Sequence, residues 1–187
     1  SIYALAKSKS ENLIKKKLNN YIILRPPLIY GPGVKANFLS LIKILHLHIP
    51  LPLKGIENKR SYLYIGNFCS VIHKIIKNNN IKNKTYNVSD GTTLSTLELC
   101  KNISNYLEKK PIFFKLNKNI IKFIFFCMNK IDLYEKVFGN FIITGEALNK
   151  DFNWKPPYNF KMGIKNTCFW YKRRFIIKKK DSKCIKL

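Results

Sequence analysis

The sequence predicts an α/β fold in which parallel strands are joined by helices. Residues 3–18 are good helix formers without Gly or Pro, and Asn19 and Asn20 end the helix. The apolar run Tyr21–Leu24 follows and stops at a Pro pair, as a short buried strand does. A helix, a two-residue turn and a buried strand form the αβ half of a parallel α/β unit.

The rest of the chain continues this alternation of helices and strands. Residues 28–38 predict a loop with a tight turn at Gly31–Gly33, and Asn37 is a candidate cap for the next helix. Ser95 with Glu98 three residues later predicts a capping box, which makes this helix start the best defined. The remaining expected elements are a half-buried strand at 60–65, a helix at 66–78, a strand at 84–91, a largely helical stretch at 116–138, a short strand or loop at 139–144, a helix ending near 151 and a last helix at 158–175.

The net charge of +25 is the most unusual feature of the composition. It would suit a protein that binds nucleic acid or another polyanion. However, only four of the 35 basic residues are Arg, the side chain that nucleic-acid-binding proteins favour for bidentate contacts. Lys, Ile and Asn are abundant together, as codon use in an AT-rich genome produces. We therefore expect no nucleic-acid partner. The less favoured alternative to an enzyme is a basic protein that binds nucleic acid or a membrane surface.

Cysteine and histidine spacing predicts no metal site. The five Cys are widely spaced, odd in number and without a CxxC pair, which fits reduced thiols and a cytoplasmic location. His46, His48 and His73 have no Cys or carboxylate at ligand spacing, and Asp132 and Glu135 are expected to lie on a helix face.

The most apolar stretch of the chain is Ile120–Met128, which has nine residues and contains Lys122. It is too short to span a bilayer, so we expect no transmembrane segment. It predicts an amphipathic helix that packs on a core or lies against a membrane surface.

Tyr3 and Lys7 form a candidate proton-transfer pair. Residues four apart share a helix face, and an ammonium near a phenol favours the phenolate and lowers the pKa of the Tyr. The spacing alone is weak evidence, because ten Tyr and 31 Lys produce one or two such pairs by chance. Tyr106 and Lys110 form a second pair, which we interpret as a surface pair.

The segments around Tyr3 make the pattern specific. The motifs are YALAKSKSE, LRPPLIYGPGVKANF, PLPL, NKRSYLYIGN, YNVSDGTTLSTLEL and NWKPP, and they run nearly from end to end. With them the chain resembles the extended short-chain dehydrogenase/reductase superfamily. Within it, the chain is most similar to the NAD-dependent epimerase/dehydratase family, and there to the UDP-sugar 4-epimerase-like proteins of bacterial polysaccharide clusters.

The resemblance implies a fold and a division of the chain. The fold is the C-terminal part of a Rossmann-like doubly wound domain plus a small mixed α/β substrate-binding domain. Residues 1–33 would be the remnant of the NAD-binding domain, and 34–175 mainly the substrate-binding domain. We expect 60–90 to return to the Rossmann sheet and 176–187 to form a basic tail.

The resemblance also assigns residues to the NAD end of the site. Tyr3 would be the catalytic acid/base, and Lys7 would lower its pKa and hold the nicotinamide ribose. The strand end at Arg25 and Pro26 would lie beside the nicotinamide, with Tyr30 nearby.

At the substrate end, the resemblance places Asn37 in the sugar-nucleotide pocket and Arg60 at the nucleotide diphosphate. Many members have a further Arg near residue 136, where this chain has Lys136 as the nearest cation. A Lys holds phosphate only as a point charge. Asn67 stands where many members have Asp.

The sequence has no GxGxxG turn after a first strand, the feature that binds dinucleotide in a Rossmann half. The resemblance therefore implies a fragment that covers about the C-terminal three-fifths of a family member. We expect the 187 residues alone to retain little NAD and to be inactive.

The function implied is that of an NAD-dependent UDP-glucose or UDP-N-acetylglucosamine 4-epimerase, with transient oxidation at the sugar C4. A sugar-nucleotide dehydratase or reductase of the same fold is the second reading. The partner would be a nucleotide sugar, and the full-length protein would be a homodimer.

Overall fold

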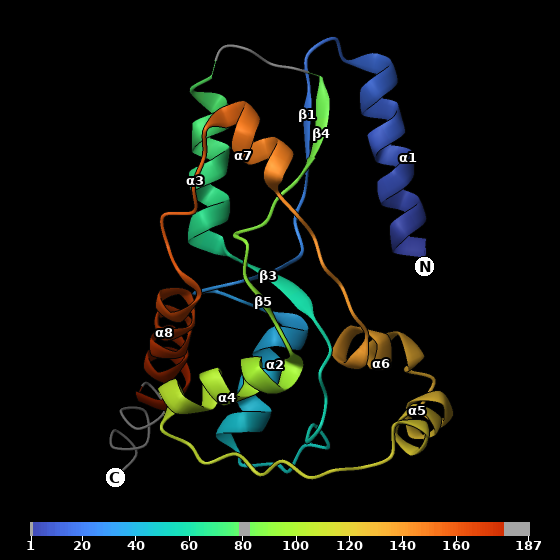
Figure 1. The fold of residues 1–187 in the computed structure, drawn as a ribbon, viewed down its shortest axis with the longest axis vertical. Helices are drawn as coiled ribbons and strands as arrows, with labels where there is room; N and C mark the ends of the chain where they lie inside the picture. Colours follow the sequence, from blue (N-terminus) through green and yellow to red (C-terminus); the bar gives the residue numbers. More distant parts are fainter. Residues whose placement is uncertain (1, 79–82, 178–187) are drawn as a thin grey trace, which may run out of the picture.

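A computed structural model describes residues 2–78 and 83–177, and it confirms the α/β class (Figure 1). The first half of the chain alternates helices and strands, and the second half is mainly helical. The elements are α1 (Ile2–Lys17), β1 (Ile22–Arg25), β2 (Leu28–Tyr30), α2 (Ala36–His46), β3 (Arg60–Tyr64), α3 (Ile65–Ile76), β4 (Lys84–Asn87), β5 (Thr93–Leu94), α4 (Thr96–Leu107), α5 (Lys118–Cys127), α6 (Ile131–Phe138), α7 (Glu146–Phe152), α8 (Phe160–Tyr171) and a π-helical turn at Lys172–Ile177.

One sheet consists of β1 and β4, which pair in parallel with Ile22 opposite Lys84 and Arg25 opposite Asn87. In Figure 1, α1 lies on one side of this pair, and α3 and α7 lie on the other. The buried residues that pack here come from β3, α3, β4, α7 and the segments after β4 and α7, and they are Leu63, Val71, Tyr86, Val88, Leu148, Phe152 and Trp154.

A second sheet has the order β2-β3-β5, with β3 parallel to β2 and antiparallel to β5. Helices α2, α4 and α8 pack beside it around the larger core. This core contains Phe38 and Ile42 of α2, Ile103 of α4 and Ile164 of α8. The two sheets therefore each have a core of their own.

Helix α1 contributes little to either core. Its residues Leu5, Leu13 and Leu18 are more than half exposed, and among the α1 side chains that the structure describes only Glu11 and Ile14 are partly covered. The position of α1 is therefore set mainly by polar contacts, which are described below.

Several details differ from the sequence prediction. Residues 28–30 form β2 rather than a loop. Strand β3 is buried from Ser61 to Tyr64 instead of alternating, because it is the central strand and contributes to both cores. Helix α2 begins after Lys35, which makes no side-chain capping bond, so Asn37 lies inside the first turn and is not the cap.

Other predictions are confirmed at the level of single residues. Ser95 accepts a hydrogen bond from the Glu98 amide (3.1 Å), and the Glu98 carboxylate accepts one from the Ser95 amide (2.8 Å). Of residues 60–90, which were expected to return to the Rossmann sheet, 84–87 pair with β1, whereas 60–64 pair with β2 in the other sheet. The boundary at residue 33 stays a prediction, and of the basic tail only 176 and 177 are described, since 178–187 lie outside the described residues.

Within the described ranges, no helix is both long and apolar enough to cross a membrane. The same residues contain no group of three His, Cys, Asp or Glu side chains that could hold a metal ion.

Candidate functional site

The carboxyl ends of β1 and β4 lie at a cavity of about 390 Å³. The two strands are parallel and in register, so their last residues, Arg25 and Asn87, lie side by side. Residues from the start of α7 complete the wall. The lining residues are Arg25, Thr85, Tyr86, Asn87, Thr144, Glu146 and Ala147. Open α/β sheets bind ligands outside the carboxyl ends of their strands, so this cavity is the first candidate for a ligand site.

Arg25 connects this cavity to α1. Its Nε donates to Oε1 of Glu11 at 2.9 Å, and its second nitrogen pairs with the other carboxylate oxygen. The hydrogen bond from Arg25 lowers the pKa of the Glu11 carboxyl. A guanidinium fork on a carboxylate fixes direction as well as distance. The middle of α1 therefore lies at the end of β1.

The same contact orients the predicted Tyr–Lys face of α1. Tyr3, Lys7 and Glu11 follow one another at intervals of four residues, so their backbone positions form one stripe of the helix. Glu11 lies at Arg25, and Lys7 is an exposed residue one turn earlier. The side chain of Tyr3 lies outside what the structure describes.

Tyr30 was expected near the nicotinamide, but the structure places it in the larger core. It is 1% exposed, its ring stacks on Phe38 with centroids 5.4 Å apart, and the rings of Tyr64 and Phe160 are within 6 Å. Burial raises the pKa of its hydroxyl. A side chain so covered has no open surface to offer a cofactor, because its neighbours come from three other elements.

Arg60 and Lys136 lie near each other in the fold. The Arg60 guanidinium donates to the carbonyl oxygens of Gly139 (2.8 Å) and Glu135 (3.2 Å), at the end of α6, where Lys136 is an exposed residue. Its guanidinium carbon also lies 5.8 Å from the centre of the Phe141 ring. Asn37 is exposed in the first turn of α2.

Asn67 forms hydrogen bonds inside the protein. It is fully buried, donates to the carboxylate of Asp90 (3.2 Å) and the carbonyl of Tyr158 (2.9 Å), and accepts from the Tyr158 amide (3.0 Å). Burial raises the pKa of Asp90 while the Asn67 amide opposes that shift. Asn67 therefore fastens the start of α3 to the chain before α8.

Sequence reasoning identified Arg25 but missed the other cavity residues. Asn87 could have been predicted as a site residue, because it lies at the end of the parallel strand that pairs with β1, opposite Arg25. Thr144 and Glu146 have no such signal, because they lie just before and at the start of α7, more than a hundred residues after β1 in the sequence.

The chain was then compared with known proteins. Residues 1–89 match the model of the NAD dependent epimerase/dehydratase family. A UDP-glucose 4-epimerase of Vibrio cholerae is 32% identical over 170 residues, which cover 88% of this chain and 52% of that protein. The chain thus spans about half the length of this curated relative.

Solved structures of similar fold point the same way. The Bordetella bronchiseptica enzyme WbmG in complex with NAD gives a TM-score of 0.70 at 16% identity, with 92% of this chain and 50% of that chain covered. A dTDP-glucose 4,6-dehydratase of Bacillus anthracis in complex with NAD gives 0.65 at 19% identity, covering 91% and 50%. At such identities the likeness concerns the fold.

The solved structures agree with the α/β fold and its parallel strand pairs. The chain is thus similar to the NAD-dependent epimerase/dehydratase family, and it carries the match to the family model in its first 89 residues.

Proposed function

We propose that the chain carries the proton-transfer and substrate-binding part of an NAD-dependent sugar-nucleotide 4-epimerase acting on UDP-glucose or UDP-N-acetylglucosamine. The observation that carries the proposal is the ion pair of Glu11 with Arg25, because it turns the Tyr3–Lys7 stripe of α1 towards the end of β1. The similarity to a UDP-glucose 4-epimerase supports the substrate class.

In this proposal Tyr3 removes the proton of the sugar C4 hydroxyl and later returns it. The Lys7 ammonium, one helical turn away, stabilises the phenolate that forms and holds the nicotinamide ribose. Arg25 and Pro26 form the strand end beside the nicotinamide. NAD supplies the hydride acceptor and donor for C4 when it is bound. The exposed Lys7 and the cavity at Arg25 fit the nicotinamide end of that cofactor.

At the other end of the substrate, Arg60 and Lys136 would neutralise the diphosphate, and Asn37 would bind the sugar nucleotide. The Arg60 guanidinium donates to the carbonyl of Glu135, which is next to Lys136 in the sequence. Two cations at one helix end suit a doubly charged group. We further propose that the whole enzyme works in the cytoplasm as a homodimer.

A dehydratase of the same fold is the second candidate, and the fold similarity to a dTDP-glucose 4,6-dehydratase favours it. Dehydration needs a further acidic partner beside the Tyr. The products separate the two, since an epimerase converts UDP-glucose to UDP-galactose and a dehydratase forms a 4-keto-6-deoxy sugar.

The test is a chimera that joins residues 1–187 to the part of the Vibrio cholerae relative that precedes the matched region. We expect the chimera to retain NAD and to interconvert UDP-glucose and UDP-galactose. Tyr3→Phe should lower kcat by at least about a hundredfold with NAD still bound, because general acid–base catalysis contributes that much. Lys7→Met should lower kcat and weaken NAD binding.

Tyr106→Phe and Lys110→Met are the matched controls, since they have the same spacing on another part of the chain. They should leave kcat unchanged. Equal losses in both pairs, or full activity of Tyr3→Phe, would refute the assignment. Turnover of dTDP-glucose to a keto sugar without epimerisation would favour the dehydratase.

A further inference from the structure

Helix α5 has two apolar faces, and among the described residues only the inner face packs against other parts of the protein. On the inner face Ile121 is 2% exposed, and the Phe125 ring lies 6.0 Å from that of Tyr134 and 6.2 Å from that of Phe138 in α6. Tyr134 and Phe138 stack on each other at 5.0 Å. These contacts hold α5 and α6 together as a hairpin.

The outer face of α5 is open. It spreads over the side of the helix away from Ile121 and continues into Met128, the residue that follows α5. Phe123 is 66% exposed and Phe126 69% exposed. The other members of this outer face are Ile120, Ile124, Cys127 and Met128, all exposed. Contiguous apolar exposure of this kind marks an interaction site.

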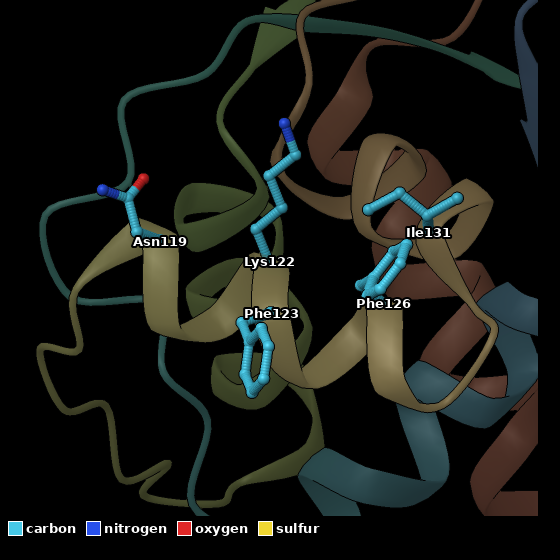
Figure 2. Close-up of a pocket in the computed structure, with 5 residues that line it drawn as sticks. All are labelled: Asn119, Lys122, Phe123, Phe126 and Ile131. Carbon is cyan, nitrogen blue, oxygen red and sulfur yellow. The ribbon is translucent and has the colours of Figure 1, made fainter.

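Figure 2 shows how this face is shaped. Phe126 of α5 and Ile131 of α6 line one cavity of about 330 Å³ with Phe123, Asn119 and the stem of Lys122. In the view of Figure 2, the Lys122 ammonium and the Phe123 ring leave the helix in opposite directions. A cation thus lies beside the exposed Phe side chains of one short helix.

The surroundings of the outer face are cationic. Residues 115–138 contain five Lys and two acidic residues, a net charge of +3, and all seven side chains are exposed. They are Lys115, Lys118, Lys122, Lys130, Lys136, Asp132 and Glu135. The whole chain carries +25. A second copy of the chain would bring the same positive surface against this one, and a nucleic acid would leave the Phe and Ile side chains without apolar contacts.

We propose that the outer face of α5 docks on the surface of an anionic phospholipid bilayer, with Phe123 and Phe126 inserted at the headgroup level and the Lys side chains on the lipid phosphates. Apolar side chains beside Lys residues are the pattern of helices that lie in the membrane interface. At ten residues, about 15 Å, α5 is too short to span the bilayer. Lys side chains near the surface are attracted to anionic lipid.

The test is co-sedimentation of the 187-residue chain with vesicles of phosphatidylcholine alone or mixed with phosphatidylglycerol. We expect binding to the mixed vesicles, weakened by salt. The double variant Phe123→Ser/Phe126→Ser should bind at least about tenfold more weakly. Phe169→Ser is the matched control, since Phe169 is 63% exposed on α8, and it should bind like the parent chain. Lys118→Glu/Lys122→Glu should also weaken binding.

Other outcomes would overturn the proposal. If the double variant Phe123→Ser/Phe126→Ser binds vesicles as well as the parent chain, the binding is due to charge attraction alone. Self-association that the Phe pair abolishes, in sedimentation velocity without lipid, would make the face a contact between copies. Loss of binding in the chimera, with binding kept by the chain alone, would mean that the rest of the enzyme covers it. Circular dichroism checks the fold of each variant, which substitutions at exposed positions should leave intact.

Discussion

Glu11 in α1 and Arg25 at the end of β1 form a two-point ion pair, and this pair joins α1 to the rest of the molecule. The leucines of α1 are mostly exposed, so apolar packing does little to hold the helix. The ion pair therefore helps to orient the Tyr3–Lys7 stripe.

Glu11→Gln should loosen α1 without unfolding the protein. The Arg25 side chain is 54% exposed, so the pair contributes about 1 kcal/mol or less to stability. We expect faster amide hydrogen exchange across α1 and little change elsewhere. Asn12→Asp, an exposed neighbour on the same helix, is the control. Unchanged exchange in Glu11→Gln would show that other contacts hold the helix.

Acid should loosen α1 in the same way. The Arg25 hydrogen bond lowers the pKa of Glu11. A carboxyl with a lowered folded pKa stabilises the protein above its unfolded pKa, and this contribution is lost as the pH falls through the folded value. The protection factors of the α1 amides, which compare each exchange rate with the intrinsic rate at the same pH, should therefore fall as the pH drops below the ordinary range of a glutamate. Glu11→Gln should remove this pH dependence, and a dependence that persists in it would belong to another group.

Ser95→Ala should destabilise the start of α4 by about 1 kcal/mol, since the side chain accepts from the Glu98 amide. Hydrogen bonds from Ser95 lower the pKa of Glu98, so the stabilisation by Glu98 is likewise lost on acidification. Urea unfolding measured at neutral and at acidic pH checks both. A cost of Ser95→Ala that does not shrink in acid would contradict the reciprocal capping box.

Asn58→Ala should cost about 3 kcal/mol, because one buried amide joins three segments. Its nitrogen donates to Thr96 Oγ1 and to the carbonyls of Val137 and Gly139 at 3.0–3.1 Å, and its oxygen accepts from the Thr96 amide at 3.0 Å. Denaturant unfolding measures the loss. Asn105→Ala on the exposed side of α4 is the control, and equal losses would show that the network is unimportant.

Gly163→Ala should destabilise the larger core by about 1–3 kcal/mol. A Cβ there would lie 2.6 Å from the Tyr30 hydroxyl and 2.9 Å from the Tyr64 ring, and Tyr30 is too tightly packed to move.

Tyr30→Phe should be nearly neutral and should relieve part of the cost of Gly163→Ala. The Tyr30 hydroxyl is buried and has no hydrogen-bond partner among the described residues. A double-mutant cycle by thermal unfolding gives the coupling. If the stability losses of Gly163→Ala and Tyr30→Phe are additive, the predicted clash is wrong. If Tyr30→Phe abolishes NAD binding in the chimera, the Tyr30 hydroxyl has a role at the cofactor.

The sequence allowed prediction where a local pattern decides the structure. The helix over 3–18 and the capping box at Ser95 depend on neighbours within four residues, and both are observed. Strands β2 and β5 have three and two residues, too few for any periodicity to be visible. The burial of Tyr30 could not be predicted, because it depends partly on Phe160, 130 residues away.

The candidate site shows the same limit. Arg25 could be predicted from its place at a strand end and from the family resemblance. Thr144 and Glu146 reach the cavity only because α7 packs on β4, which no local pattern encodes. The contacts of Arg60 with the end of α6 likewise join residues 75 and more positions apart.

The order in which the strands join the two sheets affects how the chain unfolds. The chain passes from the β1–β4 sheet to the other sheet after β1, returns after β3 and crosses again after β4. Strand β3 also contributes side chains to both cores. Neither sheet is thus formed by one continuous segment of the chain, and the loss of packing in one core destabilises strands of the other sheet. Heat or denaturant should melt both sheets in one cooperative transition, and α1, fastened by its ion pair, should detach first.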